Sequence, residues 1–374
     1  MKLRIAMVGA CPFPAPQGSQ VFMNYTAECL RLQGHEVHLV VYGYGLGEDP
    51  PGAQIHRAMR IPFATKTEAG PSLAKPFQDM TLAMKLRRVI RKHRIQVVCA
   101  HNYEALLAAL MVRKRPILYF AHNAMYDELP YFLSHGDITR EIGHCLDRTF
   151  PRLADAVIAP HKRLAGYLVA RGCDQERVFA VPPPIDASPF EPLPAESSLP
   201  PVLYAGNLDK YQNLSLLFKS MKLVRKKYPE ARLMVATASS AAHLEAEVVH
   251  ATSLKELSPF LSQDGVFAAP RVSWSGYPIK MLNAMAAGKA VVACESAAYP
   301  LAHEETGLIV PDNDVTSYAA ALIRLLENSS LRTELGGLAR EQIEKEHLPL
   351  ETGARLSEIA LAVWEGRQKK PASS

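Results

Sequence analysis

The stretch Ser273-Trp-Ser-Gly-Tyr-Pro-Ile-Lys-Met-Leu-Asn-Ala-Met-Ala-Ala-Gly-Lys-Ala-Val-Val292 contains one complete repeating unit of a parallel α/β fold. A turn with glycine and proline leads into a helix that we expect to begin near Ile279. Small and apolar residues continue to Ala287, a glycine ends the helix, and a short apolar strand follows. Free N–H groups at such a helix start bind phosphate well, and Lys280 adds a cation beside them. The spacing fits a plain loop-helix-strand crossover equally well.

The same alternation extends in both directions along the chain and indicates two series of parallel strands with helices between them. Long apolar runs such as Lys2–Ala10 are typical of strands buried on both faces. The first series has expected strands at 2–10, 36–42, 96–100, 117–121, 155–159 and 178–181, and expected helices at 20–32, 81–92, 104–112 and 160–170. The second has expected strands at 202–205, 232–236, 247–251, 265–269, 290–293 and 308–310, and expected helices at 213–226, 254–261, 278–287, 317–328 and 331–364, the last with a break near Pro349.

A proline-rich segment separates the two series and marks a linker with a restricted backbone. We expect an N-terminal Rossmann-like domain over residues 1–186, a linker over 187–200 and a C-terminal Rossmann-like domain over 201–348. A C-terminal helix in 349–374 is expected to cross back to the N-terminal domain and to end in a frayed tail. Ligands of doubly wound sheets bind at the carboxyl ends of the strands. The site is therefore expected in a cleft between two facing domains.

The composition is that of a globular enzyme. Of the 374 residues, 48% are hydrophobic and 21% are charged. The six cysteines are scattered without a Cys-x-x-Cys spacing, which argues against a zinc site of paired cysteines and against a disulfide framework. The first residues hold too short an apolar run for a signal peptide, and no stretch approaches the ~20 apolar residues that cross a bilayer. These features predict a cytoplasmic protein.

Positive charge is concentrated in the first half of the chain, most of all in Lys85–Arg94. A basic helix face of this kind can bind anionic lipid, which would place the protein at the inner face of the membrane. A solvated helix face explains the same charges. No aromatic residues interleave with them, so nucleic acid is not an expected partner.

Two other motifs favour structural roles. Gly43-Tyr-Gly-Leu-Gly47 follows a strand, but the Glu-Asp-Pro-Pro sequence after it opposes the helix that a dinucleotide fingerprint needs. We interpret it as a flexible loop. Asp312-Asn-Asp314 looks like a metal-binding acidic pair, but it directly precedes an expected helix. Asp314 is therefore interpreted as a helix N-cap.

Segments from nearly the whole chain resemble the family-4 retaining glycosyltransferases of the GT-B fold. The segment 273–292 resembles the donor site of that family, and other segments follow in the family's order. These are Pro12–Ser19, Leu32–Val37, Ala100–Glu104, Tyr119–Asn123, Val181–Asp186, Tyr204–Leu214 and Thr306–Pro311. The resemblance implies a hexosyltransferase-like enzyme that moves a sugar from a nucleotide-sugar donor to a glycan or lipid-linked acceptor with retention of anomeric configuration. It implies no metal and no other cofactor.

The chain departs from the family pattern at four charged positions. The family places two glutamates eight positions apart around the donor helix, where this chain has Ser275 and Asn283. Its arginine and lysine that neutralise the donor phosphates fall at Asn207 and Gln212. Because the two negative and the two positive charges are lost together, the charge balance of the site is kept. Lys280 would supply part of the missing positive charge. The implied donor site comprises Gly18, Gly206, Asn207, Gln212, Ser275, Gly276, Tyr277, Pro278, Ile279, Met281, Leu282 and Asn283.

His122 and Lys280 are the expected catalytic residues. Lys280, Asn207 and Gln212, with the backbone amides of Ile279, Met281 and Leu282, would stabilise the charge that develops on the leaving phosphate. His122 ends an apolar strand where the resemblance places a histidine beside the donor sugar, although a capped histidine at a strand end is the simpler alternative. The expected acceptor side comprises His101, Asn102, Asn123, Tyr126, Asp127 and Glu128.

Two other functions stay open at this point. A nucleotide-sugar epimerase shares the GT-B architecture and would convert the donor without an acceptor. A non-catalytic nucleotide-sugar-binding protein would explain the four lost charges. The nucleotide base, the sugar and the acceptor are left open by these motifs.

Overall fold

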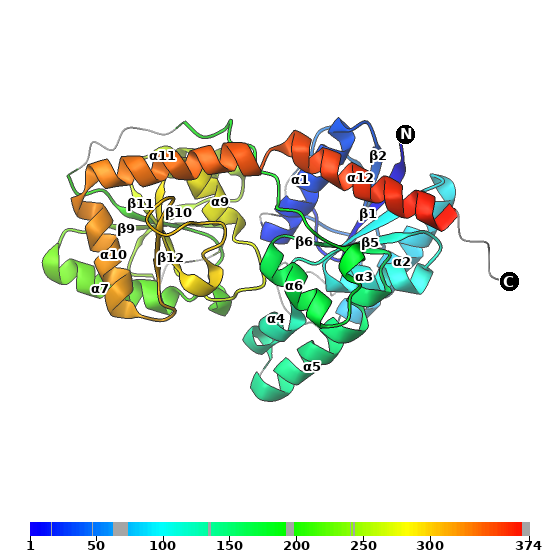
Figure 1. The fold of residues 1–374 in the computed structure, drawn as a ribbon, viewed down its shortest axis with the longest axis horizontal. Helices are drawn as coiled ribbons and strands as arrows, with labels where there is room; N and C mark the ends of the chain where they lie inside the picture. The colour runs from blue at the N-terminus through cyan, green and yellow to red at the C-terminus, as the bar shows by residue number, and fades with distance from the viewer. Residues whose placement is uncertain are drawn as a thin grey trace. The chain divides into compact units, whose positions relative to one another are not determined.

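A computed structural model of the protein describes residues 1–15, 17–46, 48–62, 74–133, 136–191, 198–239, 241 and 244–368. The chain forms two compact units (Figure 1). Unit 1 comprises Met1–Pro184 and Pro349–Ser374, and unit 2 comprises Ile185–Leu348. Much of the expected linker (192–197), the expected frayed tail (369–374) and Gly47 of the glycine loop lie outside the described residues.

Unit 1 is built on a seven-stranded parallel sheet with the order β3-β2-β1-β4-β5-β6-β7. The central strand β1 pairs with β2 and β4, so that Ile5 lies between Val37 and Val97. Every residue of β4, β5 and β6 is buried, as the continuous apolar runs predict for a parallel sheet. The strands are β1 (Arg4–Gly9), β2 (Glu36–Val41), β3 (Gln54–Arg57), β4 (Val97–His101), β5 (Ile117–Phe120), β6 (Ala156–Ala159) and β7 (Val178–Ala180).

The helices of unit 1 begin and end where the local sequence allows it. The chain leaves the first helix through Gly34, whose φ of 80° suits glycine better than any other residue. The Arg4 amide donates to the Gln96 side chain at 3.0 Å, which ties the segment after the second helix to the sheet. The helices are α1 (Gly18–Leu32), α2 (Lys75–Lys92), α3 (Tyr103–Val112), α4 (Met125–Phe132), α5 (Gly136–Thr149), α6 (Lys162–Ala170) and α12 (Pro349–Gln368), with 3-10 turns at Pro151–Leu153 and Gln175–Arg177.

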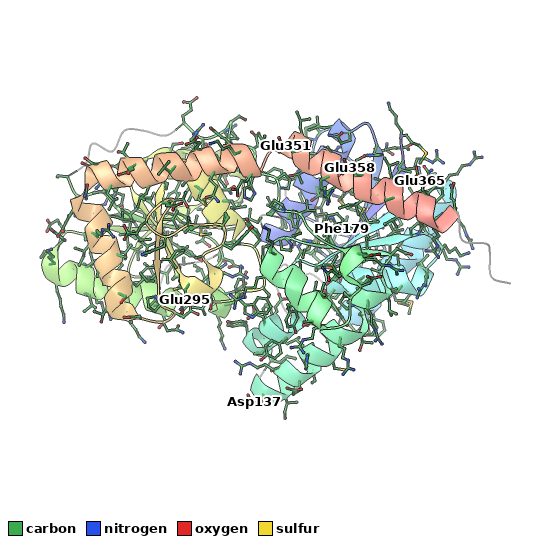
Figure 2. The ribbon with its side chains drawn as sticks, in the orientation of Figure 1. Asp137, Phe179, Glu295, Glu351, Glu358 and Glu365 are labelled. Carbon is green, nitrogen blue, oxygen red and sulfur yellow. The ribbon has the colours of Figure 1, made fainter. Side chains whose placement is uncertain are left out.

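The C-terminal helix α12 packs against α1 within unit 1. A Cβ atom at Gly353 would lie 2.7 Å from the Cys29 carbonyl oxygen, so glycine is needed for this close approach. His35 Nε2 lies 2.8 Å from the Ser357 hydroxyl and adds a polar tie. The opposite face of α12 carries the exposed Glu351, Glu358 and Glu365, which recur every seven residues along it (Figure 2). This helix therefore has one packed face and one charged face.

Unit 2 is built on a six-stranded parallel sheet with the order β10-β9-β8-β11-β12-β13. A Cβ atom at Gly336 would lie only 2.0 Å from the Gly288 carbonyl oxygen, so α11 packs directly on the end of α9. The strands are β8 (Val202–Ala205), β9 (Leu233–Thr237), β10 (Glu247–His250), β11 (Val266–Ala269), β12 (Ala290–Cys294) and β13 (Leu308–Val310). The helices are α7 (Leu214–Lys227), α8 (Leu254–Ser262), α9 (Ile279–Ala286), α10 (Val315–Glu327) and α11 (Ser329–Glu346), with 3-10 turns at Lys210–Gln212 and Glu295–Ala297.

The two predicted parallel sheets are confirmed, and three elements were not predicted. These are the edge strand β3 and the helix pair α4 and α5.

Asp314 caps α10, since its side chain accepts hydrogen bonds from the Thr316 and Ser317 amides at 3.0 Å each. No helix follows Tyr42 before β3 among the described residues, so the dinucleotide fingerprint is absent there. Within the described part of the chain, no helix is both long and apolar enough to cross a membrane.

Candidate functional site

Lys280 is the residue that stands out at the start of α9. Every other residue of this helix is buried, because its sequence is made of apolar and small side chains together with Asn283. Burial lowers the pKa of the Lys280 ammonium to about 8. No acidic side chain of the described ranges forms an ion pair with it, so a desolvated cation lies at the positive end of a helix dipole. An anionic ligand would compensate both the desolvated charge of Lys280 and the positive end of the helix dipole.

The backbone amides of the first turn differ from the expectation. The Ile279 amide donates to the carbonyl two residues before it at 3.0 Å, and the Met281 and Leu282 amides donate to Pro278 at 2.9 and 3.2 Å. The prediction that all three face a phosphate is therefore wrong, because the turn at Pro278 closes on itself. The Lys280 amide donates to no described residue. It is the N–H group of this turn that is left for a ligand.

Arg271 is a second cation at this place, and sequence reasoning missed it. Its Nε donates to the Ser273 carbonyl at 3.0 Å, and its Nη2 donates to the Ser273 hydroxyl at 3.1 Å. The guanidinium carbon lies 5.1 Å from the centre of the Tyr211 ring. A Cβ atom at Gly276 would lie 2.4 Å from Nη2, so the glycine leaves room for the guanidinium. A basic residue directly after the expected strand 265–269 was the available signal.

Asn207 and Gln212 join one hydrogen-bond network after β8. Gly206 ends the strand, and the Asn207 amide nitrogen then donates to Asp209 at 2.6 Å and to the Tyr211 hydroxyl at 2.7 Å. The Gln212 amide nitrogen donates to Asn207 Oδ1 at 2.7 Å. Both N–H groups of Asn207 are used within the protein. The network thus holds the Tyr211 ring, on whose face the Arg271 guanidinium lies.

The two positions that carry glutamates in the resembling family are buried here. Ser275 is fully buried and Asn283 is 3% exposed. The Oδ1 atom of Asn283 is buried and accepts no hydrogen bond from the described residues. Tyr277 lies between these two positions in the sequence. Its hydroxyl lies 3.4 Å from His347 Nε2, and its ring packs edge-on against Tyr299. An ionised glutamate at either position would need a charged partner that this surrounding lacks.

In unit 1 the structure brings His101 and His122 together at the carboxyl ends of β4 and β5. His101 Nδ1 lies 3.0 Å from His122 Nε2. The His101 ring stacks on Phe120, with 4.2 Å between ring centres, and Phe22 of α1 lies against both imidazoles. Burial lowers the pKa of His122 to about 4 and holds that of His101 well below its usual range. Both rings are therefore neutral near pH 7 and act there as hydrogen-bonding groups.

Two expected residues directly follow these histidines in sequence, and a third begins α1, the helix whose Phe22 lies against both rings. Asn102 is a helix cap, because its Oδ1 accepts the Ala105 amide of α3 at 3.1 Å. Asn123 directly follows His122 and is partly exposed. Gly18 is exposed as the first residue of α1, and the Gln17 side chain before it does not cap the helix. The start of α1 thus presents backbone without a side chain in the way.

The remaining acceptor-side residues belong to α4. Tyr126, Asp127 and Glu128 occupy its first turn, and all three are partly exposed. Asp147 of α5 holds this turn, since its carboxylate accepts the Met125 and Tyr126 amides at 2.9 and 3.0 Å. The helix therefore has an acidic first turn anchored by a buried carboxylate, which suits the helix dipole.

A partly buried polar cluster near the carboxyl ends of the strands was also missed. The Tyr42 hydroxyl donates to Asp79 at 2.5 Å, and Lys75 donates to Glu104 at 2.5 Å. Burial raises the pKa of Asp79 to about 6, against the hydrogen bond from Tyr42, which lowers it. The four residues come from three separate parts of the chain, so no sequence motif marks them. Asp79 is a carboxyl group that titrates near neutral pH.

Comparison with known proteins identifies two family models in the chain. The model "Glycosyltransferase Family 4" matches residues 16–189, and the model "Glycosyl transferases group 1" matches residues 200–328. The phosphatidyl-myo-inositol mannosyltransferase of Mycolicibacterium smegmatis is 25% identical over 376 residues, which cover 92% of this chain and 90% of that protein.

Solved structures share the fold at low sequence identity. Sucrose-phosphate synthase from Thermosynechococcus elongatus superimposes with a TM-score of 0.80 at 16% identity, covering 98% of this chain and 100% of that one. Anabaena HepE in complex with UDP-glucose gives a TM-score of 0.72 at 12% identity, covering 95% and 98%. The two predicted parallel sheets thus occur together in solved structures, one of which contains UDP-glucose.

Replacing Asp79 with asparagine should change how stability depends on pH. The folded-state pKa of Asp79 is raised, so the folded protein holds an extra proton between about pH 4 and 6 and loses stability as pH rises through that range. The free energy of unfolding of Asp79→Asn, relative to that of the wild type, should therefore be about 2 kcal/mol higher at pH 7.5 than at pH 4.5. Urea unfolding at both pH values measures this difference.

Asp137→Asn is the matched control, because Asp137 lies exposed on α5 (Figure 2). Its effect should be the same at both pH values. An equal effect of Asp79→Asn at pH 4.5 and 7.5 would show that Asp79 is not a carboxyl group with a raised pKa.

Proposed function

The chain belongs to glycosyltransferase family 4 and has the GT-B fold, and from this premise we propose that it transfers a hexose from a nucleoside-diphosphate sugar to a lipid-linked acceptor with retention of anomeric configuration. UDP-sugars are the first donors to test, because the structural neighbour HepE was solved with UDP-glucose. Unit 2 is the proposed donor side and unit 1 the proposed acceptor side.

The observation that carries the donor proposal is the unpaired Lys280 ammonium at the start of α9. Burial lowers its pKa, which means that the surroundings disfavour the charged form when no anion is present. A diphosphate would restore the favourable environment through charge-assisted hydrogen bonds to the ammonium and to the free Lys280 amide. Both groups belong to one residue, so the phosphate position is narrowly defined.

Arg271 is proposed to replace the cations that the family has at positions 207 and 212. Those positions carry Asn207 and Gln212, which bond to each other instead. The guanidinium has no carboxylate partner among the residues that the structure describes, and Ser273 orients it. An arginine held in this way presents further N–H donors that match two phosphate oxygens. The positive charge is thus moved to another element of the same unit.

Asn283 is proposed to contact the ribose of the donor. Its buried Oδ1 lacks a donor, and a buried acceptor without a partner costs about 1–3 kcal/mol. A ribose hydroxyl can supply that hydrogen bond, as it would to the glutamate of other family members. The neutral amide avoids an uncompensated buried charge, which a glutamate would introduce here.

The reaction then needs charge stabilisation more than acid-base catalysis by the protein. The bond from the anomeric carbon to the β-phosphate oxygen breaks, the acceptor oxygen bonds to the same face, and its proton passes to the departing phosphate. Lys280 and Arg271 stabilise the negative charge on that phosphate. His122 is neutral and is assigned a hydrogen bond to the transferred sugar, with His101 fixing its ring.

Removing either proposed cation should weaken donor binding. We expect UDP to stabilise the protein thermally more than GDP, ADP or TDP does. Arg271→Gln and Lys280→Gln should each raise the Kd for UDP at least tenfold, since each removes a charge-assisted hydrogen bond to phosphate. Arg324→Gln and Lys219→Gln, on exposed parts of α10 and α7, are the matched controls and should leave Kd unchanged. Wild-type UDP affinity in both test variants would remove the diphosphate from the start of α9.

His122→Ala should lower kcat by more than tenfold while KM for the donor changes little, because the hydrogen bond is assigned to the sugar as it departs. With a His122 pKa near 4, the wild-type rate should show no titration of this residue between pH 5.5 and 8. His250→Ala, in an exposed strand of unit 2, is the control. Steady-state kinetics with a confirmed donor measure both parameters. Unchanged kcat would leave His122 with a structural role only.

A lipid-linked acceptor is supported by the outer surface of α2. Phe77, Met80 and Met84 are exposed at helical spacing, and the exposed Arg88 and Arg91 continue the same face. Apolar side chains followed by arginines suit insertion beside anionic headgroups. The relative from Mycolicibacterium smegmatis is named for a phosphatidyl-myo-inositol acceptor, which points in the same direction.

The protein should sediment with phosphatidylglycerol-containing vesicles and not with pure phosphatidylcholine vesicles. Reversing two charges in Arg88→Glu/Arg91→Glu should lower vesicle binding more than tenfold, since each basic residue near the surface contributes about 1 kcal/mol. Arg177→Glu, at another exposed position of unit 1, is the control. Equal binding of both variants would exclude α2 as the contact.

Conversion of the donor without any acceptor would instead indicate an epimerase.

A further inference from the structure

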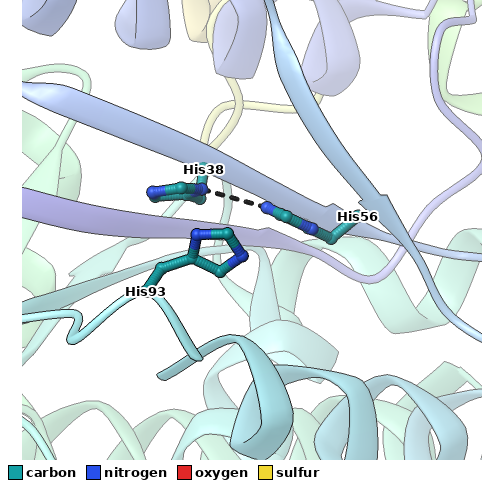
Figure 3. A group of neighbouring side chains, drawn as sticks. All are labelled: His38, His56 and His93. Carbon is teal, nitrogen blue, oxygen red and sulfur yellow. Dashed lines mark hydrogen bonds between the residues drawn. The ribbon is translucent and has the colours of Figure 1, made fainter. Parts of the chain in front are cut away.

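Three histidines outside the candidate site converge at one place in unit 1. His38 lies on β2, His56 lies on β3, and His93 directly follows α2 (Figure 3). One ring nitrogen of each lies within 4.8 Å of the corresponding nitrogens of the other two. They are separated by long stretches of sequence, so the fold brings them together.

The sheet register explains how this happens. His38 pairs with Gln54, and Val40 pairs with His56, so the two histidines lie two positions apart along neighbouring strands and share one face of the sheet. Helix α2 contacts β2 and β3, and its C-terminal end supplies His93. His38 and His56 lie within their strands, level with Ala6 and Val8 of β1, and the end of α2 places His93 beside them. His101 and His122 lie at the carboxyl ends.

The hydrogen bonds within the cluster direct one nitrogen lone pair, that of His38, inward. His38 Nε2 lies 2.9 Å from Glu36, and a carboxylate accepts, so Nε2 carries the proton and Nδ1 has the lone pair. That Nδ1 accepts from His56 Nε2 at 3.0 Å, and a metal ion would take the place of the proton between the two nitrogens. His93 Nε2 is buried and has no hydrogen-bond partner in the described ranges. A buried polar atom without a hydrogen-bond partner lowers the stability of the fold unless a ligand bonds to it.

We propose that His38, His56 and His93 bind one divalent transition-metal ion, with Zn²⁺ as the first candidate, while Glu36 orients the His38 ring. Zinc bonds imidazole nitrogen at about 2.0–2.1 Å, so two ligands in a tetrahedral site lie roughly 3.3 Å apart. The His38–His56 pair already has nearly this spacing, and His93 needs to approach by about 1 Å. A histidine that donates its other N–H to a carboxylate is the usual arrangement of a metal ligand.

The surroundings suit a cation that is held by neutral ligands. The three imidazole rings have their centres 4.3 to 5.2 Å apart, and imidazole binds a transition-metal ion in its neutral form. Glu36 supplies the negative charge, and Lys85 and Lys92 are the positive groups that face His56 from α2. His56 and His93 are partly exposed, which leaves room for water as the fourth ligand. The ion would tie the edge strands β2 and β3 to the end of α2.

Metal binding can be measured on the full chain, purified without a polyhistidine tag and freed of metal with EDTA. Isothermal titration with Zn²⁺ should show one ion per chain, and Zn²⁺ should raise the melting temperature by several degrees. Co²⁺ should give the visible absorption bands of a tetrahedral site. Absence of stoichiometric Zn²⁺ binding to the wild-type protein would overturn the proposal.

Variants assign the site to these residues. Glu36→Gln should weaken Zn²⁺ binding about tenfold, as loss of a carboxylate that orients a ligand does. His93→Ala and His56→Gln should weaken it further and abolish the Co²⁺ bands. His250→Ala is the control and should bind as the wild type does. Retention of wild-type affinity in both His93→Ala and His56→Gln would place any bound ion elsewhere. Two separate ligand variants keep the test decisive if one of them fails to fold.

Discussion

A desolvated positive charge at the start of α9 is the constraint on which the proposed chemistry depends. The rest of the helix is buried, so the Lys280 ammonium is held in surroundings that lower its pKa. The turn before it uses the neighbouring amides internally and leaves the Lys280 amide free. A charge that is fixed before the ligand arrives requires little reorganisation when negative charge develops on a leaving phosphate. Without a ligand, this desolvated charge lowers the stability of the folded protein, which is typical of binding sites.

The charge pattern around this point is consistent as a whole. Ser275 and Asn283 are neutral where the family resemblance predicts glutamates, and Asn207 and Gln212 are neutral where it predicts cations. A glutamate at either position would be a buried negative charge without a partner, so a neutral residue at these positions avoids an unfavourable charge. Arg271 then restores a positive charge from a different element, with Gly276 leaving the space that it occupies. Charge has been redistributed within the unit.

The sequence predicted those features that a local pattern encodes. The central strands are continuous apolar runs, and Asp314 stands directly before a helix, so both could be predicted. Strand β3 is mostly half-buried and lies at an edge, which gives it no apolar run. Helix α5 buries Thr139, Gly143 and Asp147 and exposes Ile138 and Ile142, so the residues on its inner face are polar or small. The roles of Arg271 and of the histidine cluster depend on contacts between distant segments, which one sequence does not reveal.

The sheet of unit 1 separates two kinds of histidine along its strands. At the carboxyl ends, His101 and His122 are neutral and stacked against aromatic rings, which suits hydrogen bonding to an uncharged sugar. On strands β2 and β3 near the edge of the sheet, His38 is bonded to a carboxylate and directs a lone pair toward a second imidazole. That pattern suits a cation, because an oriented neutral imidazole is a metal ligand. An ion there would stiffen the edge of the sheet without entering the reaction, so a metal-independent transferase and a bound metal are compatible in one chain.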